Sequence, residues 1–173
     1  MTFTTPQTKS FLSWFGNSVV RTVNGSPLIV FHGSSNAFNA FFTSEGTLEG
    51  AAFFTTCPNL AEGFGESAAQ SGAFLDPDWW PVLYPVFLSL QNPMVVDDLN
   101  RFMTVDNSGP LHNFSKMKDL IQHAKQTGHD GLWLKDVPDL DTTGDQFAAF
   151  HPTQIKSAYN TGAFSLHNQD IAK

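Results

Sequence analysis

The chain has few charged residues and few arginines, and these shortages exclude one class of partner. Asp, Glu, Lys and Arg make up 14% of the 173 residues, against about 25% in an average soluble domain. Arg21 and Arg101 are the two arginines, and 16 acidic residues against 9 basic ones leave a net charge of −7. Proteins that bind nucleic acid normally carry a basic patch, so the composition argues against DNA or RNA as the main partner.

The chain also lacks paired cysteines and long apolar runs. Cys57 is the single cysteine, which excludes an internal disulfide and a multi-cysteine zinc site, and we expect it to be a small apolar core residue. No apolar run reaches the length of a membrane span, and the N-terminus has no signal-peptide pattern. We therefore expect a soluble, monomeric chain, with no membrane partner, in the cytoplasm. Delivery by a dedicated secretion machine would leave the same composition.

Phenylalanine, in contrast, is abundant. It supplies 17 residues of a chain that is 41% hydrophobic, which suits one domain with a substantial core. We expect a single domain over residues 1–173 with a core rich in Phe. Strand patterns predominate without a regular βαβ alternation, and this order favours an α+β fold over a doubly wound parallel sheet.

Apolar periodicity and turn residues predict the individual elements. Helices are expected over 6–15, with Thr5 as the N-cap, over 60–70 and over 115–127. Strands are expected over 18–23, 27–31, 51–56, 82–90, 131–134, 146–150 and 154–158. The pair Asn24-Gly25 between the first two strands predicts a β-hairpin. The ranges 71–81 and 135–144 are expected to be loops, the second of them acidic.

The most informative motif is an apolar strand, Leu28–Phe31, that ends abruptly in His32, Gly33 and Ser34. Glycine has no Cβ and lets a ligand approach the backbone closely. The imidazole of His32 offers a donor and an acceptor near neutral pH. Taken alone, the motif is equally consistent with a strand followed by an ordinary surface turn.

Two further strand-end motifs follow this one along the chain. They are Phe53–Thr56, with Ala61–Phe64 after it, and Asp145–Phe150. In this order, the three motifs resemble the three-part signature of ADP-ribosyltransferases of the diphtheria-toxin and poly-ADP-ribose-polymerase type. Residues 15–20, 24–27, 91–93, 128–131 and 150–158 look like the small ADP-ribosyltransferase domains of phage polyvalent proteins and bacterial effectors. The similarity extends over nearly the whole chain, although no single motif is specific.

The resemblance implies a fold, a co-substrate and a binding mode. The fold is α+β, with a split, mostly antiparallel sheet and flanking helices, and the co-substrate is NAD without a metal. Gly33 would hold the nicotinamide carboxamide through its main-chain N–H and C=O groups. His32 would bind the adenosine ribose, and Ser34 would support the nicotinamide end.

The resemblance also assigns aromatic side chains to the nicotinamide ring. Phe64 would stack on one side, and Phe53 or Phe54, with Thr55 beside them, would lie on the other. Stacking needs a π-face and no hydroxyl, so Phe can replace the Tyr that is usual in the family. Core packing is the alternative role for each of these rings.

The third motif departs from the family pattern, because Gln146 stands where Glu is usual. That Glu places negative charge near an oxocarbenium-like transition state through the ribose 2′-hydroxyl. Gln146 can accept a hydrogen bond but carries no charge, a loss of about two to three orders of magnitude in rate. Three explanations stay open: Asp145 or Asp141 supplies the carboxylate, the target supplies it, or the protein binds NAD and transfers poorly.

The resemblance gives roles to the two expected loops as well. Residues 71–81 correspond to a segment that covers NAD in the family, and residues 135–145 to a loop that contacts the target. Asp136, Asp139 and Asp141 would recognise a protein with a basic surface. The overall prediction is a mono-ADP-ribosyltransferase that modifies a protein as a bacterial or phage effector or toxin, acting in the cytoplasm or in a host cytosol. An NAD glycohydrolase and a non-catalytic NAD-binding or interaction module are the alternatives.

Overall fold

The computed structural model describes residues 5–43, 50–72, 80–101, 114–139 and 142–173. The strands are β1 (Val30–Ser34), β2 (Ala52–Thr55), β3 (Val82–Leu88), β4 (Met94–Val96), β5 (Gly131–Asp139), β6 (Thr142–Ala149) and β7 (Ile155–Ser157). The α-helices are α1 (Lys9–Phe15), α2 (Pro58–Gly72) and α3 (Phe114–Gln126), and two short 3-10 turns are η1 (Leu99–Arg101) and η3 (Pro152–Gln154). None of the described helices is long and apolar enough to cross a membrane.

The strands form one sheet in the order β4-β5-β6-β2-β1-β3-β7. Neighbouring strands are antiparallel except β4 and β5, which are parallel. At the centre, β1 and β2 are joined by the single pair Phe31–Thr55, so the sheet divides there into two halves. The α+β class and the split, mostly antiparallel sheet that the sequence predicts are confirmed.

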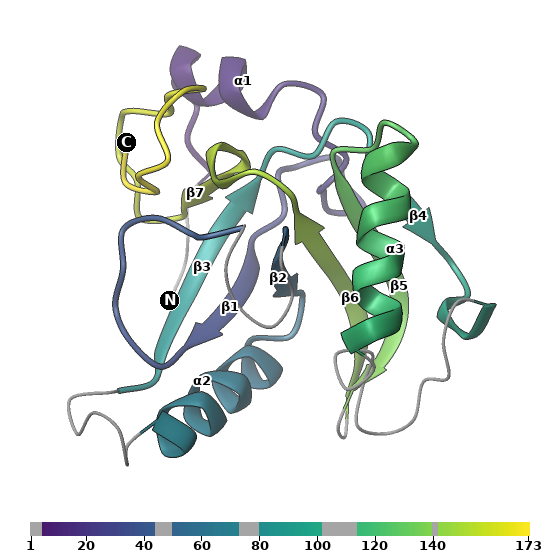
Figure 1. Ribbon diagram of the computed structural model, residues 1–173. Helices are drawn as coiled ribbons and strands as arrows, with labels where there is room; N and C mark the ends of the chain where they lie inside the picture. The colour runs from purple at the N-terminus through teal and green to yellow at the C-terminus, as the bar shows by residue number, and fades with distance from the viewer. Residues whose placement is uncertain (1–4, 44–49, 73–79, 102–113, 140–141) are drawn as a thin grey trace.

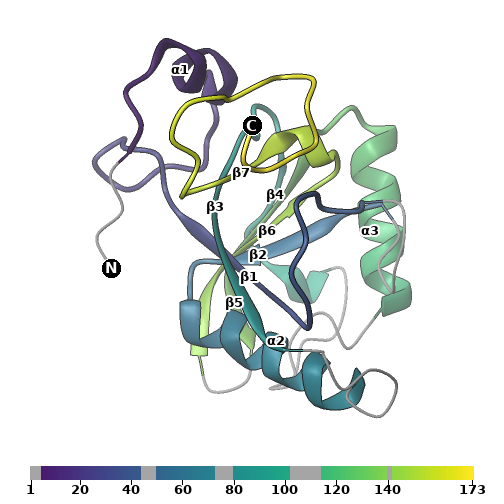
Figure 2. The same cartoon turned by 90° about the vertical axis from the view of Figure 1, so that its left-hand side faces the viewer.

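The helices cover different parts of this sheet. Helix α2 packs mainly on β1 and lies across the ends of β1 and β2, whereas α3 packs on β5 (Figure 1). The view turned by 90° shows the same separation (Figure 2). The apolar stripe predicted for α3 packs against β5 and β6 in a cluster that includes Met117, Leu120, Ile121, Ala124, Leu132, Leu134 and Ala148. A second cluster, which includes Val30 of β1, Phe54 of β2 and Phe147 of β6, packs on the sheet across its divided centre.

Two features near the N-terminus differ from prediction. Helix α1 begins after Thr8, not Thr5, because the Thr8 side chain accepts a hydrogen bond from the main-chain N–H of Phe11. The expected hairpin around Gly25 reduces to an isolated bridge between Arg21 and Pro27. The Arg21 guanidinium binds main-chain carbonyls of this segment, including that of Gly25 at 2.9 Å. Main-chain hydrogen bonds from Thr22 to Ser26 and from Leu28 to Val20 flank the bridge, so the antiparallel pairing is present but short.

The expected acidic loop over 135–144 contains the ends of two paired strands. Strand β5 continues to Asp139 and pairs with Thr142 at the start of β6. A β-bulge lies between Leu134 and Val137, and Asp136 within it has a φ of 49°. Aspartate is depleted in strands, which is why the sequence pattern predicts a loop here. Of the other expected loop, over 71–81, the residues 73–79 lie outside the described part of the chain.

Candidate active site

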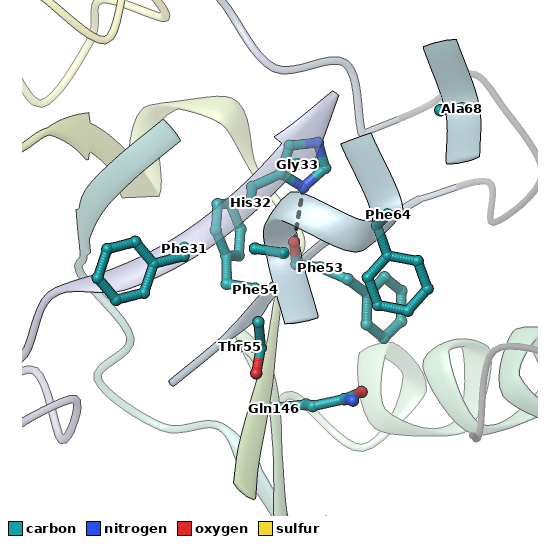
Figure 3. A pocket seen from close by; sticks show the side chains of 10 residues that line it. Phe31, His32, Gly33, Phe53, Phe54, Thr55, Phe64, Ala68 and Gln146 are labelled. Carbon is teal, nitrogen blue, oxygen red and sulfur yellow. Dashed lines mark hydrogen bonds between the residues drawn. The ribbon is translucent and has the colours of Figure 1, made fainter. Parts of the chain in front are cut away.

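A pocket of about 250 Å³ opens at the divided centre of the sheet, and α2 forms one of its walls (Figure 3). Strands β1, β2 and β6 and helix α2 contribute its lining: Phe31, His32, Gly33, Phe53, Phe54, Thr55, Ala61, Phe64, Ala68 and Gln146. Residues that the sequence assigns to three separate motifs therefore line one pocket. Ser34, also assigned to it, is not among the lining residues and hydrogen-bonds the Asn36 side chain at 3.4 Å.

Gly33 is required by its contact with helix α2. A Cβ at residue 33 would lie 1.7 Å from the Ala61 carbonyl oxygen and 2.7 Å from the main-chain nitrogen of Gly65. A Cβ at Gly65 would in turn lie 3.2 Å from the Ser34 carbonyl oxygen. The motif around Gly33 predicts a close approach of a ligand to its backbone, but the space beside its Cα is filled by the backbone of α2. The two glycines thus set how closely α2 approaches β1.

The end of β1 presents main-chain groups to the pocket. Residues Val30–Ser34 pair with β3 along their whole length, but β1 pairs with β2 at Phe31. Beyond Phe31, the N–H and C=O groups that point toward β2 are not paired with that strand. A strand edge of this kind binds an amide group in the same way as it binds another strand.

His32 is held in one orientation beside this edge. Its Nδ1 lies 2.7 Å from the Phe53 carbonyl oxygen (Figure 3), and because a carbonyl can only accept, Nδ1 carries the proton. Burial lowers the pKa of His32 below its ordinary value of 6.5, and the bond to Phe53 opposes this effect without reversing it. The imidazole is neutral at pH 7, so Nε2 is an acceptor for a ligand hydroxyl.

The aromatic side chains of the pocket differ in how much ring surface they expose. Phe54 is 2% exposed, and its ring lies 5.3 Å from Phe41 in the core, so it offers little surface to a ligand. Phe53 and Phe64 are partly exposed. In Figure 3 their rings point into the same part of the pocket, on the side of the Gln146 amide. Of the two β2 rings that the sequence offers as stacking partners, Phe53 is the more exposed, and it also packs against the core cluster of α3, β5 and β6.

Gln146 lies on β6, where it pairs with Thr55 of β2 and Leu134 of β5. Its side chain is 3% exposed, and Nε2 donates a hydrogen bond of 2.8 Å to Oδ2 of Asp139. Asp139 is 1% exposed. Its predicted role as a surface residue that recognises the target is therefore wrong, because it lies in β5 on the face of the sheet that Gln146 occupies. Sequence reasoning misses the contact of Asp139 with the third motif.

The sequence matches the family described as "ADP-Ribosyltransferase in polyvalent proteins" over residues 23–164. The chain belongs to this ADP-ribosyltransferase family. No curated protein and no solved structure matches it. The matched range contains every strand of the sheet and all residues that line the pocket. Among the described residues, no group of three His, Cys, Asp or Glu side chains could hold a metal ion.

Asp145 is not among the residues that line the pocket of the ADP-ribosyltransferase domain. Asp145 lies on the opposite face of β6 from its neighbour Gln146, because successive side chains of a strand alternate. Its carboxylate accepts hydrogen bonds from the Trp133 indole at 2.8 Å and from the main-chain N–H of Asp136 at 3.1 Å. This placement disfavours Asp145 as the missing carboxylate. Asp141, the other candidate, lies outside the described residues.

The stability of this ADP-ribosyltransferase domain is expected to fall as the pH decreases below 6.5, the ordinary pKa of histidine. In that range the unfolded chain protonates His32 while the folded chain, with its lowered pKa, does not. The unfolded state therefore binds more protons and gains free energy relative to the folded state. Urea denaturation at pH 7.5 and 5.5 measures the loss, which should be smaller in His32→Gln. An equal loss in both proteins would contradict the assignment to His32.

Proposed function

We propose that this domain cleaves the bond between nicotinamide and ribose in NAD and transfers a single ADP-ribose to a protein. The observation that carries the proposal is the shared pocket. It combines the open edge of β1, the neutral imidazole of His32, two partly exposed rings and the buried amide of Gln146. These groups match the chemistry of nicotinamide riboside: a carboxamide, an aromatic ring and sugar hydroxyls.

Each lining group has a role in this reaction. The main chain at Gly33 holds the carboxamide, and Phe53 and Phe64 flank the nicotinamide ring. His32 Nε2 accepts a hydrogen bond from a ribose hydroxyl, and Gln146 Oε1 accepts one from the 2′-hydroxyl beside the reacting carbon. These contacts orient the substrate and favour the positive charge that develops on the ribose.

The reaction itself is a substitution at ribose C1′. The bond from C1′ to nicotinamide N1 breaks, and both electrons go to N1, which converts the pyridinium to neutral nicotinamide. A nucleophilic side chain of the target forms a bond to C1′, and its proton passes to solvent. Binding pockets for whole drug-sized ligands occupy about 300–1,000 Å³, so the pocket of about 250 Å³ suits the nicotinamide end of NAD, not the entire molecule.

The target is proposed to be a protein with a basic surface. The net charge of −7 supports attraction to such a surface. Of the three aspartates predicted to recognise the target, Asp136 is exposed and Asp139 is buried. A role as a bacterial or phage effector or toxin, acting in the cytosol, extends this proposal and is supported by the family of polyvalent proteins to which the domain belongs.

Nicotinamide release from NAD by the purified chain, with and without cell lysate, tests the proposed function. Release that requires lysate, together with ADP-ribose on a lysate protein, is the expected result. Release without lysate would identify an NAD glycohydrolase instead. A rise in melting temperature with NAD but no release would identify a binding module, and the absence of both effects would overturn the proposal.

Replacing Phe64 by Ala is expected to raise the KM for NAD about tenfold. Loss of one stacked ring costs about 1.5 kcal/mol, and about 1.4 kcal/mol corresponds to a factor of ten in affinity. Phe64→Tyr keeps the π-face and should stay near the wild-type KM. Leu12→Ala removes an exposed apolar side chain of α1 and is the control. Equal KM values for Phe64→Ala and wild type would remove Phe64 from the site.

A further inference from the structure

We infer that Asp139 is a positioning residue that acts through Gln146 in the reaction proposed above, and the inference rests on that proposed function. Asp139 holds the Gln146 amide so that its oxygen serves the substrate, and it supplies the negative charge that Gln146 lacks. The observation behind this inference is the buried hydrogen bond of 2.8 Å between Gln146 Nε2 and Asp139 Oδ2, at the edge of the pocket.

The bond determines which end of the Gln146 amide is left for a ligand. A carboxylate accepts hydrogen bonds and cannot donate them, so it selects the NH₂ end of the amide. The carbonyl oxygen Oε1 is then directed away from Asp139. In Figure 3 the Gln146 amide extends toward the side of the pocket that holds the rings of Phe53 and Phe64. Gln146 therefore presents an acceptor, as a glutamate would, at the expected position of the ribose 2′-hydroxyl.

The bulge in β5 explains why Asp139 reaches Gln146. Before the bulge, Leu134 pairs with Gln146, and after it, Val137 pairs with Gly144. Strand β5 thus contains one extra residue, and side chains beyond it exchange faces. Without the bulge, Asp139 would lie on the opposite face from Leu134 and Gln146. With it, Asp139 pairs with Thr142, which shares the face of Gln146.

Asp145 stabilises this bulge from the other face of the sheet. Its Oδ1 accepts the main-chain N–H of Asp136, the bulge residue with a φ of 49°. Its Oδ2 accepts the indole N–H of Trp133. Asp145, which the sequence suggests as a catalytic carboxylate, therefore acts indirectly. It stabilises the bulge in β5 that places Asp139 within hydrogen-bond distance of Gln146. Gly144, between Thr142 and Gln146 on the same face, places no side chain between the two partners.

The charge of Asp139 compensates for the missing glutamate in two ways. A carboxylate bonded to an amide N–H polarises that amide, and its carbonyl oxygen becomes a stronger acceptor by about 10–30%. In its ionised form, Asp139 also places a negative charge in a buried site, where a low dielectric screens the charge less than water would. Both effects increase as positive charge develops on the ribose, so they act on the transition state more than on bound NAD.

A pair of exchange variants tests this inference by nicotinamide release. Asp139→Asn is expected to lower kcat about 30-fold and to change the KM for NAD less than about twofold, because the effect is confined to the transition state. Gln146→Glu alone is expected to lower kcat as well, because it places two carboxylates together in a buried site. The double variant, Asp139→Asn with Gln146→Glu, moves the carboxylate to position 146 and the amide donor to position 139. It should recover at least the wild-type kcat.

The double variant distinguishes positioning from a structural role. Asp119→Asn removes an exposed charge on α3 and is the matched control. A wild-type kcat in Asp139→Asn, or losses that multiply in the double variant, would overturn the inference. If Asp139→Asn does not fold, the kcat of the double variant tests the inference instead, since this variant preserves the side-chain volume and the hydrogen bond. Failure of the double variant to fold would also overturn the inference. An inactive wild-type protein that does not bind NAD would instead show that the proposed function has failed.

Discussion

Replacing Gly33 by Ala is expected to lower the melting temperature by about 10 °C. A Cβ at this position would lie 1.7 Å from the carbonyl oxygen of Ala61, a contact with helix backbone that cannot be relieved by turning a side chain. Overpacking of this kind costs about 3 kcal/mol, and each kcal/mol shifts the melting temperature of a domain of this size by about 2–4 °C. Thermal unfolding followed by circular dichroism measures the change.

Gly63→Ala is the matched control for this prediction. Gly63 lies on the same helix, and a Cβ there would meet no atom within 4 Å. Alanine favours the helix over glycine by about 1 kcal/mol, so this variant should melt slightly above the wild type. Similar melting temperatures for the two alanine variants would show that α2 does not pack on β1 as described. NAD binding should fall in Gly33→Ala even where the protein folds, because α2 carries Phe64 into the pocket.

Replacing His32 by Ala is expected to lower kcat/KM for nicotinamide release about 100-fold. The variant loses the Nε2 acceptor and leaves a ribose hydroxyl of the bound substrate without a partner, a cost of about 1–3 kcal/mol. It also loses the bond of 2.7 Å from Nδ1 to the Phe53 carbonyl, which joins β1 to β2 at the divided centre of the sheet. The initial rate of nicotinamide release at several NAD concentrations measures the change.

The control for His32 is His123→Ala. His123 is exposed on α3, outside the pocket, and its removal should leave the rate unchanged. The melting temperature of His32→Ala shows whether the variant has lost structure. His32→Gln restores a hydrogen-bond acceptor without the imidazole ring, so a higher rate in this variant would point to the acceptor. Wild-type rates in His32→Ala would remove this residue from the proposed mechanism while leaving the family assignment intact.

Most of the architecture could be predicted from local patterns. The strands predicted over 27–31 and 51–56 and the helix predicted over 115–127 overlap β1, β2 and α3, because short apolar runs and apolar residues at helical spacing are local signals. The three motifs that contain His32, Phe64 and Gln146 could be ordered along the chain and compared with a known family. The match over residues 23–164 confirms that comparison.

The surroundings of Asp136, Asp139 and Asp145 on β5 and β6 could not be predicted in this way. Nothing local distinguishes Asp139, which is 1% exposed, from Asp136, which is exposed, because both follow the same short strand pattern. The difference comes from one extra residue in β5, and that residue is evident only from the pairing of β5 with β6. Asp145 illustrates the same limit, since its partners Trp133 and Asp136 belong to the other strand.

The sequence by itself determined the fold class, the order of the three motifs and the absence of a glutamate at the third. These are properties of residue type and local spacing, and they do not depend on what lies across the sheet. Only the tertiary structure decided that Gly33 serves helix α2, that Phe53 and not Phe54 exposes its ring, and that Asp139 is bonded to Gln146. These three features depend on strand register or helix packing. Both bring together residues that are far apart along the chain, and no local sequence pattern shows which of them will meet.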